Sequence, residues 1–190
     1  NPQYLAILPK LEEGKKLPLL IYLHGAGGRG NDIARLRGQM MSVYLGMQKH
    51  AVAPCIVVAP QCHWQPKSIW TPKDLNVFLQ HLKATFPIDA TRVYLTGNSM
   101  GGYGTWALAM REPDRFAAIA PICGGGNTRS INYIGKISAS IWAFHGAKDT
   151  VIPISELHAM KKAQQQQGVE MKVTIYPEAG HNSWNNAYED

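Results

Sequence analysis

A serine flanked by glycines is the residue of this chain best placed to do chemistry. Ser99 stands in Gly97-Asn98-Ser99-Met100-Gly101, a G-x-S-x-G pattern that follows an apolar run and precedes a helix-like stretch. A sharp strand-to-helix turn would project the hydroxyl clear of a sheet, and glycines at both ends of the pattern avoid Cβ collisions there. The pattern predicts a nucleophile at Ser99; the alternative is an ordinary glycine-rich turn with an exposed serine.

A serine nucleophile needs an imidazole as its base and a carboxylate that orients the imidazole. In strand–serine–helix folds the acid and then the histidine follow the serine along the chain. His181, in a loop after the last apolar run, is the predicted base, whereas His145 ends a run and is interpreted as structural. Asp149, in the loop after that same run, is the predicted acid; its alternative role is that of a turn aspartate. Five other carboxylates in this part of the chain have ordinary surface interpretations: Glu112, Asp114, Glu156, Glu170 and Glu178.

Acyl transfer at a serine also requires hydrogen-bond donors for the oxyanion. The residue after the nucleophile, Met100, supplies one backbone N–H. We expect the second donor in the glycine loop Leu23-His24-Gly25-Ala26-Gly27-Gly28, with Ala26 as the first choice and Gly27 as the second. A phosphate-binding loop is the competing interpretation, but neither G-x-x-x-x-G-K-[ST] nor G-x-G-x-x-G is present.

Apolar runs alternate with helix-like stretches along the chain. This alternation predicts an α/β fold in which a mostly parallel central sheet, flanked by helices, holds these residues. The expected strands are 4–8, 19–23, 55–59, 92–96, 116–122, 140–145 and 172–176. The expected helices are 74–86, capped by Asp74, then 101–111, and one that begins near Ser155 and ends at Gly168. The Gln164–Gln167 run within it is interpreted as a solvated face.

Composition bounds the remaining possibilities. The 190 residues fit a single catalytic domain over 1–190, with 45% hydrophobic and 17% charged residues, as in globular proteins. The net charge of +6 is scattered, so we expect no nucleic-acid partner, and no apolar run is long enough to span a membrane. Three cysteines without paired ligand spacing predict no metal site and no disulfide framework. Oligomeric state and cellular location stay open, a secreted or periplasmic location included.

Four motifs in order give the chain a family resemblance: HGAGG, GNSMGG, GAKDTVIP and EAGHNSW. Together they resemble the α/β-hydrolase superfamily, and most closely its small serine esterases: feruloyl and acetyl-xylan esterases, polyhydroxybutyrate depolymerases and the phospholipase/carboxylesterase group. The resemblance implies Ser99, Asp149 and His181 as a catalytic triad, Ala26 and Met100 as oxyanion donors, and no cofactor. The region after His181 is shorter than the terminal helix of such proteins.

The expected reaction is hydrolysis of a carboxylic ester through an acyl-enzyme. A serine nucleophile argues against the aspartate-using dehalogenases and epoxide hydrolases and against the cysteine-using dienelactone hydrolases. The short connection 123–136 predicts a minimal lid and an open site. Such a site suits small or polysaccharide-linked esters, such as feruloyl or acetyl esters of plant-wall polysaccharide, better than a buried long acyl chain. Trp64, Trp70 and Trp184 are candidate substrate contacts, with ordinary loop packing as their alternative. A prolyl-oligopeptidase-like peptidase and a noncatalytic carbohydrate-binding domain are the alternative functions.

Overall fold

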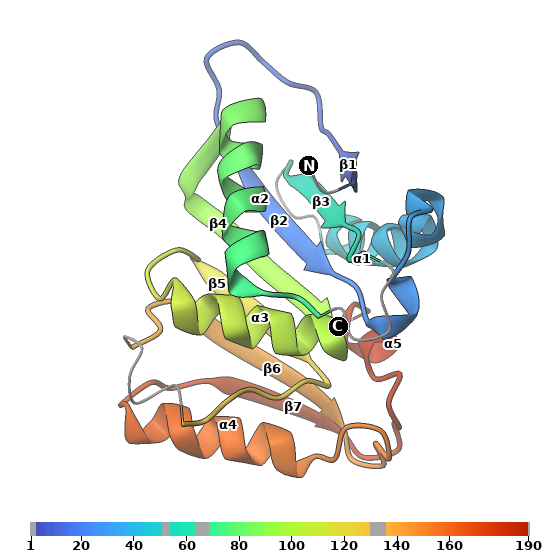
Figure 1. Cartoon of the computed structure of the whole chain (residues 1–190), viewed down its shortest axis with the longest axis vertical. Helices are drawn as coiled ribbons and strands as arrows, with labels where there is room; N and C mark the ends of the chain where they lie inside the picture. The colour runs from blue at the N-terminus through green and yellow to red at the C-terminus, as the bar shows by residue number, and fades with distance from the viewer. Residues whose placement is uncertain (1–2, 51–53, 64–68, 130–135, 190) are drawn as a thin grey trace.

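The computed structural model describes residues 3–50, 54–63, 69–129 and 136–189. Within them, seven strands form one sheet in the order β1-β3-β2-β4-β5-β6-β7, flanked by helices (Figure 1). The strands are β1 Tyr4–Ile7, β2 Leu17–Leu23, β3 Ile56–Pro60, β4 Ile88–Asn98, β5 Ala118–Ile122, β6 Ser140–Gly146 and β7 Lys172–Tyr176. The helices are α1 Arg37–Lys49, α2 Pro72–Thr85, α3 Met100–Arg111, α4 Ser155–Gln166 and α5 Trp184–Ala187, with 3-10 turns η1 Ala26–Gly28 and η2 Ile33–Leu36.

The register of the sheet brings the chemical loops to one edge. Only β1 pairs antiparallel, with β3, and the other described pairs are parallel. Leu23 at the end of β2 pairs with Gly97 near the end of β4, and Gly146 at the end of β6 pairs with Tyr176 at the end of β7. The loops after these strands therefore leave the sheet at its carboxyl edge, where ligands bind in open α/β sheets. The predicted mostly parallel α/β architecture is confirmed.

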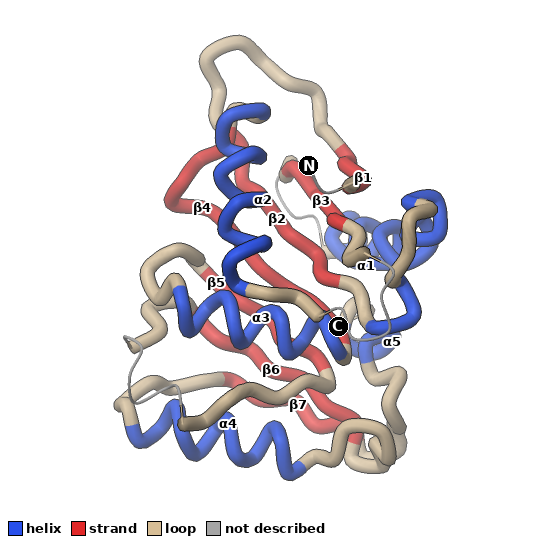
Figure 2. Tube along the Cα trace, in the orientation of Figure 1, coloured by secondary structure: helices blue, strands red, loops and turns tan. Residues whose placement is uncertain are grey.

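Helices cover both faces of the sheet (Figure 2). Alternate residues of β2 show this division: Leu19 and Ile21 pack in the cluster beneath α2, α3 and α4, whereas Tyr22 packs in the cluster beneath α1. Central strands buried on both faces account for the nearly continuous apolar runs in the sequence. The short α5 lies on the same side of the sheet as α1, as Figure 1 shows.

Two local predictions at the helices need correction. The N-cap of α2 is Thr71 and not Asp74: its hydroxyl accepts the Asp74 backbone N–H at 3.1 Å and donates to the Asp74 carboxylate at 2.6 Å, and Pro72 begins the helix. The glutamine run of α4 is not wholly solvated, because Gln164 is buried. At the end of α4, Gly168 adopts the left-handed conformation that the sequence predicts, with φ +67°.

The connection between β5 and β6 carries no helix in its described parts, 123–129 and 136–139. Residues 130–135 of the predicted minimal lid region lie outside the described residues. Among the described helices, none has the length and apolar character needed to cross a bilayer.

Candidate active site

Ser99 sits on a strained turn between β4 and α3. Its φ of 56° is a left-handed value that a serine seldom adopts, and it marks a site where surrounding structure enforces the geometry. Gly97 and Gly101 permit the turn: a Cβ on Gly97 would lie 2.6 Å from the Gly101 carbonyl oxygen, and one on Gly101 would collide with the Leu23 carbonyl. The Ser99 N–H donates to the Ile122 carbonyl at 3.0 Å, which ties the turn to β5.

The three residues predicted as a triad converge at the carboxyl edge of the sheet. His181 Nε2 lies 2.9 Å from Ser99 Oγ, and His181 Nδ1 lies 2.8 Å from Asp149 Oδ2. With Nδ1–H donating to the carboxylate, the lone pair of Nε2 faces the serine hydroxyl and can accept its proton. The geometry is that of an activated hydroxyl nucleophile.

Asp149 is held by its own loop. Its Oδ1 accepts the backbone N–H groups of Val151 and Ile152, both at 2.9 Å, which leaves Oδ2 for His181. Burial raises the pKa of Asp149, but the hydrogen bonds from His181 and from the two backbone groups outweigh it and hold the pKa below its usual value. Asp149 is therefore a carboxylate at neutral pH and can stabilise a cationic imidazole.

His145 is buried behind the acid, in agreement with its structural interpretation. Its Nε2 lies 2.8 Å from the Ile152 carbonyl and 3.4 Å from Asp149 Oδ2. Since a carbonyl only accepts, Nε2 carries the proton and donates to the acid loop. His145 thus supports the segment that positions Asp149 and does not face Ser99.

The loops that carry Asp149 and His181 are packed backbone to backbone. Gly146 has no room for a Cβ against the carbonyls of Ala179 and Gly180, and the Lys148 N–H donates to the Ala179 carbonyl at 3.0 Å. Gly146 is therefore a position where the close approach of the two loops excludes a side chain. The Lys148 ammonium also pairs with Glu178 across the two loops.

The predicted oxyanion loop lies beside the serine. Ala26 and Met100 line the same cleft as Ser99, and a Cβ on Gly25 would lie 3.5 Å from the Ser99 Cβ. Gly27, the second choice for a donor, is exposed like Ala26 but does not line the cleft. The placement favours Ala26 over Gly27 as the partner of Met100.

His24, which the sequence analysis passed over, anchors this loop. The buried ring donates from Nδ1 to the Gly25 carbonyl at 2.6 Å and accepts the Cys62 N–H at Nε2, 3.0 Å away. Burial lowers the pKa of His24 from 6.5 to about 4, and the nearby Arg29 adds to the effect against the opposing Gly25 hydrogen bond. His24 is therefore neutral at pH 7. A histidine at the end of a buried strand, next to a glycine loop, is the sequence signal that could have identified it.

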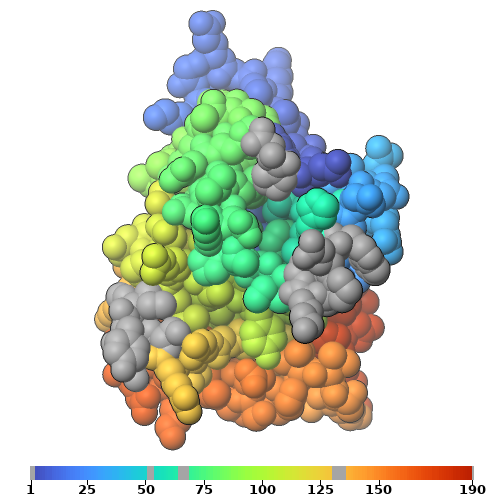
Figure 3. Space-filling model, viewed as in Figure 1, coloured from blue at the N-terminus to red at the C-terminus, as the bar shows by residue number. Residues whose placement is uncertain are grey.

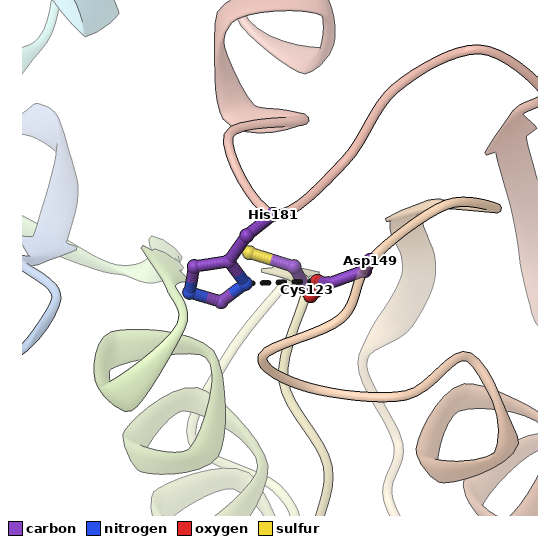
Figure 4. A group of neighbouring side chains, drawn as sticks. All are labelled: Cys123, Asp149 and His181. Carbon is purple, nitrogen blue, oxygen red and sulfur yellow. Dashed lines mark hydrogen bonds and ion pairs between the residues drawn. The ribbon is translucent and has the colours of Figure 1, made fainter.

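Cys123 completes the surroundings of the triad. Its Sγ and the nearest ligand atoms of Asp149 and His181 lie within 4.8 Å of one another. Figure 4 shows the three side chains together. Such a group could in principle hold a metal ion, but both nitrogens of His181 are engaged with Asp149 and Ser99. Burial raises the pKa of the Cys123 thiol to about 12, so the thiol is neutral and a poor metal ligand. Its place directly after β5, at the carboxyl edge, is the signal that sequence reasoning missed.

A cleft of about 610 Å³ opens beside Ser99. It is lined by Ala26, Ile69, Trp70, Pro72, Ser99, Met100, Tyr103, Gly104, Ala107, Met110, Arg111, Gly126, Asn127, Val151 and Ile152. Most of these side chains are apolar, and Ser99, Tyr103, Arg111 and Asn127 carry the polar groups. Ile69, Val151 and Ile152 were not predicted as lining residues, although the apolar pair Val151 and Ile152, close after the predicted acid, was a usable signal.

The three predicted tryptophan contacts have different placements. Trp70 lines the cleft, and its indole N–H donates to the His24 carbonyl at 3.0 Å, so it joins the cleft wall to the oxyanion loop. Trp184 does not line the cleft; its ring packs edge-on against His181, with centroids 5.4 Å apart. Trp64 lies outside the described residues.

Several known proteins of similar sequence or structure are esterases. "Probable feruloyl esterase C" of Aspergillus terreus (strain NIH 2624 / FGSC A1156) is 26% identical over 162 residues, which cover 80% of this chain and 56% of that protein. The crystal structure of a thermostable esterase superposes with a TM-score of 0.85 at 33% identity, covering 98% of this chain and 56% of the other. A feruloyl esterase module from Clostridium thermocellum, in complex with sinapinate, shares the fold at 15% identity and a TM-score of 0.77, over 99% of this chain and 81% of the module. The chain thus spans about half the length of the first two.

The family comparison corrects one sequence-based exclusion. The model of the Dienelactone hydrolase family matches residues 42–189, which include Ser99, Asp149 and His181. The sequence analysis set dienelactone hydrolases aside because they use cysteine, yet the match shows that a serine at the nucleophile position does not place a chain outside this family. The resemblance to the α/β-hydrolase superfamily is confirmed, and the chain belongs to the dienelactone hydrolase family within it.

Proposed function

We propose that this protein is a serine carboxylester hydrolase that works through an acyl-enzyme. The observation that carries the proposal is the continuous hydrogen-bonded chain from Ser99 Oγ through His181 to Asp149, at 2.9 and 2.8 Å. Family membership and the similarity to esterases support it.

Acylation follows from this geometry. Ser99 Oγ attacks the ester carbonyl carbon while its proton passes to His181 Nε2, and the carbonyl oxygen becomes an oxyanion facing the N–H groups of Ala26 and Met100. The carbon–oxygen bond to the alcohol then breaks, and the leaving oxygen takes the proton from Nε2. The acyl group remains on Ser99. Nε2 is then again a free base. It takes a proton from water as the water oxygen attacks the acyl carbon, and it returns the proton to Ser99 Oγ as the carboxylic acid leaves.

The proposed substrates are feruloyl or acetyl esters, free or linked to plant-wall polysaccharide. The similarity to feruloyl esterases, at low identity, supports this class. The apolar cleft beside Ser99 also supports it, because the cleft offers surface for an aromatic acyl group. The site uses no cofactor in this proposal, because every proton transfer runs through His181 Nε2, which takes a proton from Ser99 or water and returns it to the departing oxygen.

A panel of p-nitrophenyl and methyl hydroxycinnamate esters, with a peptide amide for comparison, tests the proposal. Hydrolysis of the esters is expected, together with labelling of Ser99 by a fluorophosphonate probe. Ser99→Ala should abolish labelling and lower turnover by about 10⁶-fold, as for other triad nucleophiles. Retention of more than about a tenth of the activity, or hydrolysis of the amide alone, would contradict it.

A further inference from the structure

The cleft beside Ser99 continues along one face of α3, beyond anything the triad needs. Its lining includes Met100, Gly104, Ala107 and Arg111, which recur at intervals of three to four residues and so share one face of the helix. At 1.5 Å per residue this stretch of α3 is about 16 Å long. A groove therefore runs from the nucleophile to the far end of the helix.

The walls of the groove are apolar at its mouth. Ile69, before α2, and Val151, in the acid loop, each expose 62% of their surface and both line the groove. Leaving two such side chains in water is unfavourable, and a ligand that covers them recovers that loss. This side of the molecule is seen in Figure 3, between the green surface of α2 and the orange surface of α4.

The arm of the ester that enters the groove is set by the position of His181. The leaving oxygen must receive its proton from His181 Nε2, so the alcohol departs on the side of the imidazole. His181 is not part of the lining of the groove, whereas Ser99 and both expected oxyanion donors are. The arm that points away from His181 and into the groove is therefore the acyl arm.

A charge stands at the distal end of the groove. Arg111 is exposed, closes the row of α3 residues in the lining, and follows a stretch in which Tyr103, Ala107 and Met110 offer mainly carbon. A guanidinium at the end of an apolar path matches a carboxylate at the end of an apolar chain.

We propose that the groove along α3 binds an elongated acyl arm, so that the enzyme favours long apolar acyl groups with a distal carboxylate over acetyl. This inference rests on the proposed ester hydrolysis and names the substrate class of the same site. Of the two acyl groups considered above it disfavours acetyl, and the distal carboxylate goes beyond the feruloyl group.

The first test varies the acyl arm with a constant leaving group. In wild-type protein, kcat/KM should rise from p-nitrophenyl acetate through butyrate to octanoate. Ala107→Trp, which places a large ring in the middle of the groove, should lower the octanoate-to-acetate ratio of kcat/KM by about tenfold or more. Ala84→Trp, at an exposed position of α2 outside the groove, is the matched control and should leave the ratio unchanged. Ala107→Leu places a smaller side chain in the groove, and it should also lower the octanoate-to-acetate ratio of kcat/KM; it replaces the tryptophan variant if that variant fails to fold.

The second test concerns the distal charge. The mono-p-nitrophenyl ester of a dicarboxylic acid should be preferred over the uncharged ester of equal length, by up to about fivefold, the range of an exposed ion pair. Arg111→Gln should remove this preference, and Arg115→Gln, which disrupts only the pair with Glu112, should keep it. High salt should weaken the preference in the wild-type protein.

The outcomes separate the inference from the proposed function. If no ester is hydrolysed, the proposed function fails. If acetate is hydrolysed as well as the longer esters, or if Ala107 variants leave the length preference intact, ester hydrolysis stands and the groove is not the acyl site. If kcat/KM rises with acyl length but Arg111→Gln does not change the preference for the charged ester, the proposed recognition of a distal carboxylate is wrong.

Discussion

Lowering the pH from 7 toward 4 should destabilise the protein through one buried imidazole, that of His24. The ring is fixed as a neutral tautomer: Nδ1–H donates to the Gly25 carbonyl, and Nε2 accepts the Cys62 N–H. Protonation of Nε2 would turn this acceptor into a donor that faces another donor. The cation would also be fully buried, since His24 has no exposed surface.

The size and sign of the effect follow from the pKa of His24, which is about 4 in the folded protein against an ordinary value of 6.5. Between these values the unfolded chain binds more protons than the folded one, so the free energy of unfolding falls as the pH is lowered through this window. At about 1.4 kcal/mol for each pKa unit, the loss should be about 2 kcal/mol by pH 5 and about 3 kcal/mol by pH 4.

Urea unfolding followed by tryptophan fluorescence at pH 7 and pH 5 measures this loss. Carboxylates also titrate on the way down, so the informative quantity is the comparison with His24→Asn, which keeps a donor toward Gly25 but cannot titrate. That variant should be less stable at pH 7 by about 1–3 kcal/mol, because the Cys62 N–H loses its acceptor, and should lose less stability on acidification. His158→Asn, at an exposed histidine of α4, should behave as wild type. Equal losses in the wild type and in His24→Asn would refute the reasoning.

Three further outcomes are expected at the site. Asp149→Asn should lower kcat by about 10⁴-fold with little change in fold, because an amide no longer holds His181 in the required tautomer; steady-state kinetics on the best ester of the panel measure it, and a loss below about tenfold would contradict the role. Gly101→Ala should prevent folding or remove activity, because the added Cβ collides with the Leu23 carbonyl; circular dichroism and fluorophosphonate labelling distinguish the two, and a fully active variant would be inconsistent with the packing. His145→Phe should lower kcat far more than KM, because the Ile152 carbonyl and Asp149 lose their shared donor; an unchanged kcat would leave His145 as core packing alone.

The strands were predictable from sequence because burial on both faces leaves a continuous apolar run. β6 and β7 were predicted to within a residue, whereas the predicted strands 19–23 and 92–96 cover only part of β2 and β4. The early part of β4 has exposed residues at 90–92, so no continuous apolar run marks its start. α1 was missed for the converse reason: of its thirteen residues only Met40 and Val43 are buried, so its apolar periodicity is too weak to predict a helix.

The triad was predictable because the order of its residues along the chain is fixed by the fold. Each of Ser99, Asp149 and His181 follows a parallel strand, and parallel strands deliver their carboxyl ends to one edge. The residues that line the cleft obey no such rule, since Ile69, before α2, and Val151, in the acid loop, line one cleft together with residues of α3. Their proximity is a product of tertiary packing.

The precision of the site depends on these same loops being fixed by their backbones. Catalytic distances near 2.9 Å between residues 82 positions apart require that neither loop drift. The bonds that prevent drift are mainly main-chain contacts: Ser99 N–H to β5, the 146–148 loop against 179–180, and Asp149 against its own turn. Because these contacts depend on backbone geometry more than on side-chain identity, the side chains of the cleft are free to differ without disturbing the triad. Substrate choice can therefore change along α3 while the chemistry at Ser99 stays the same.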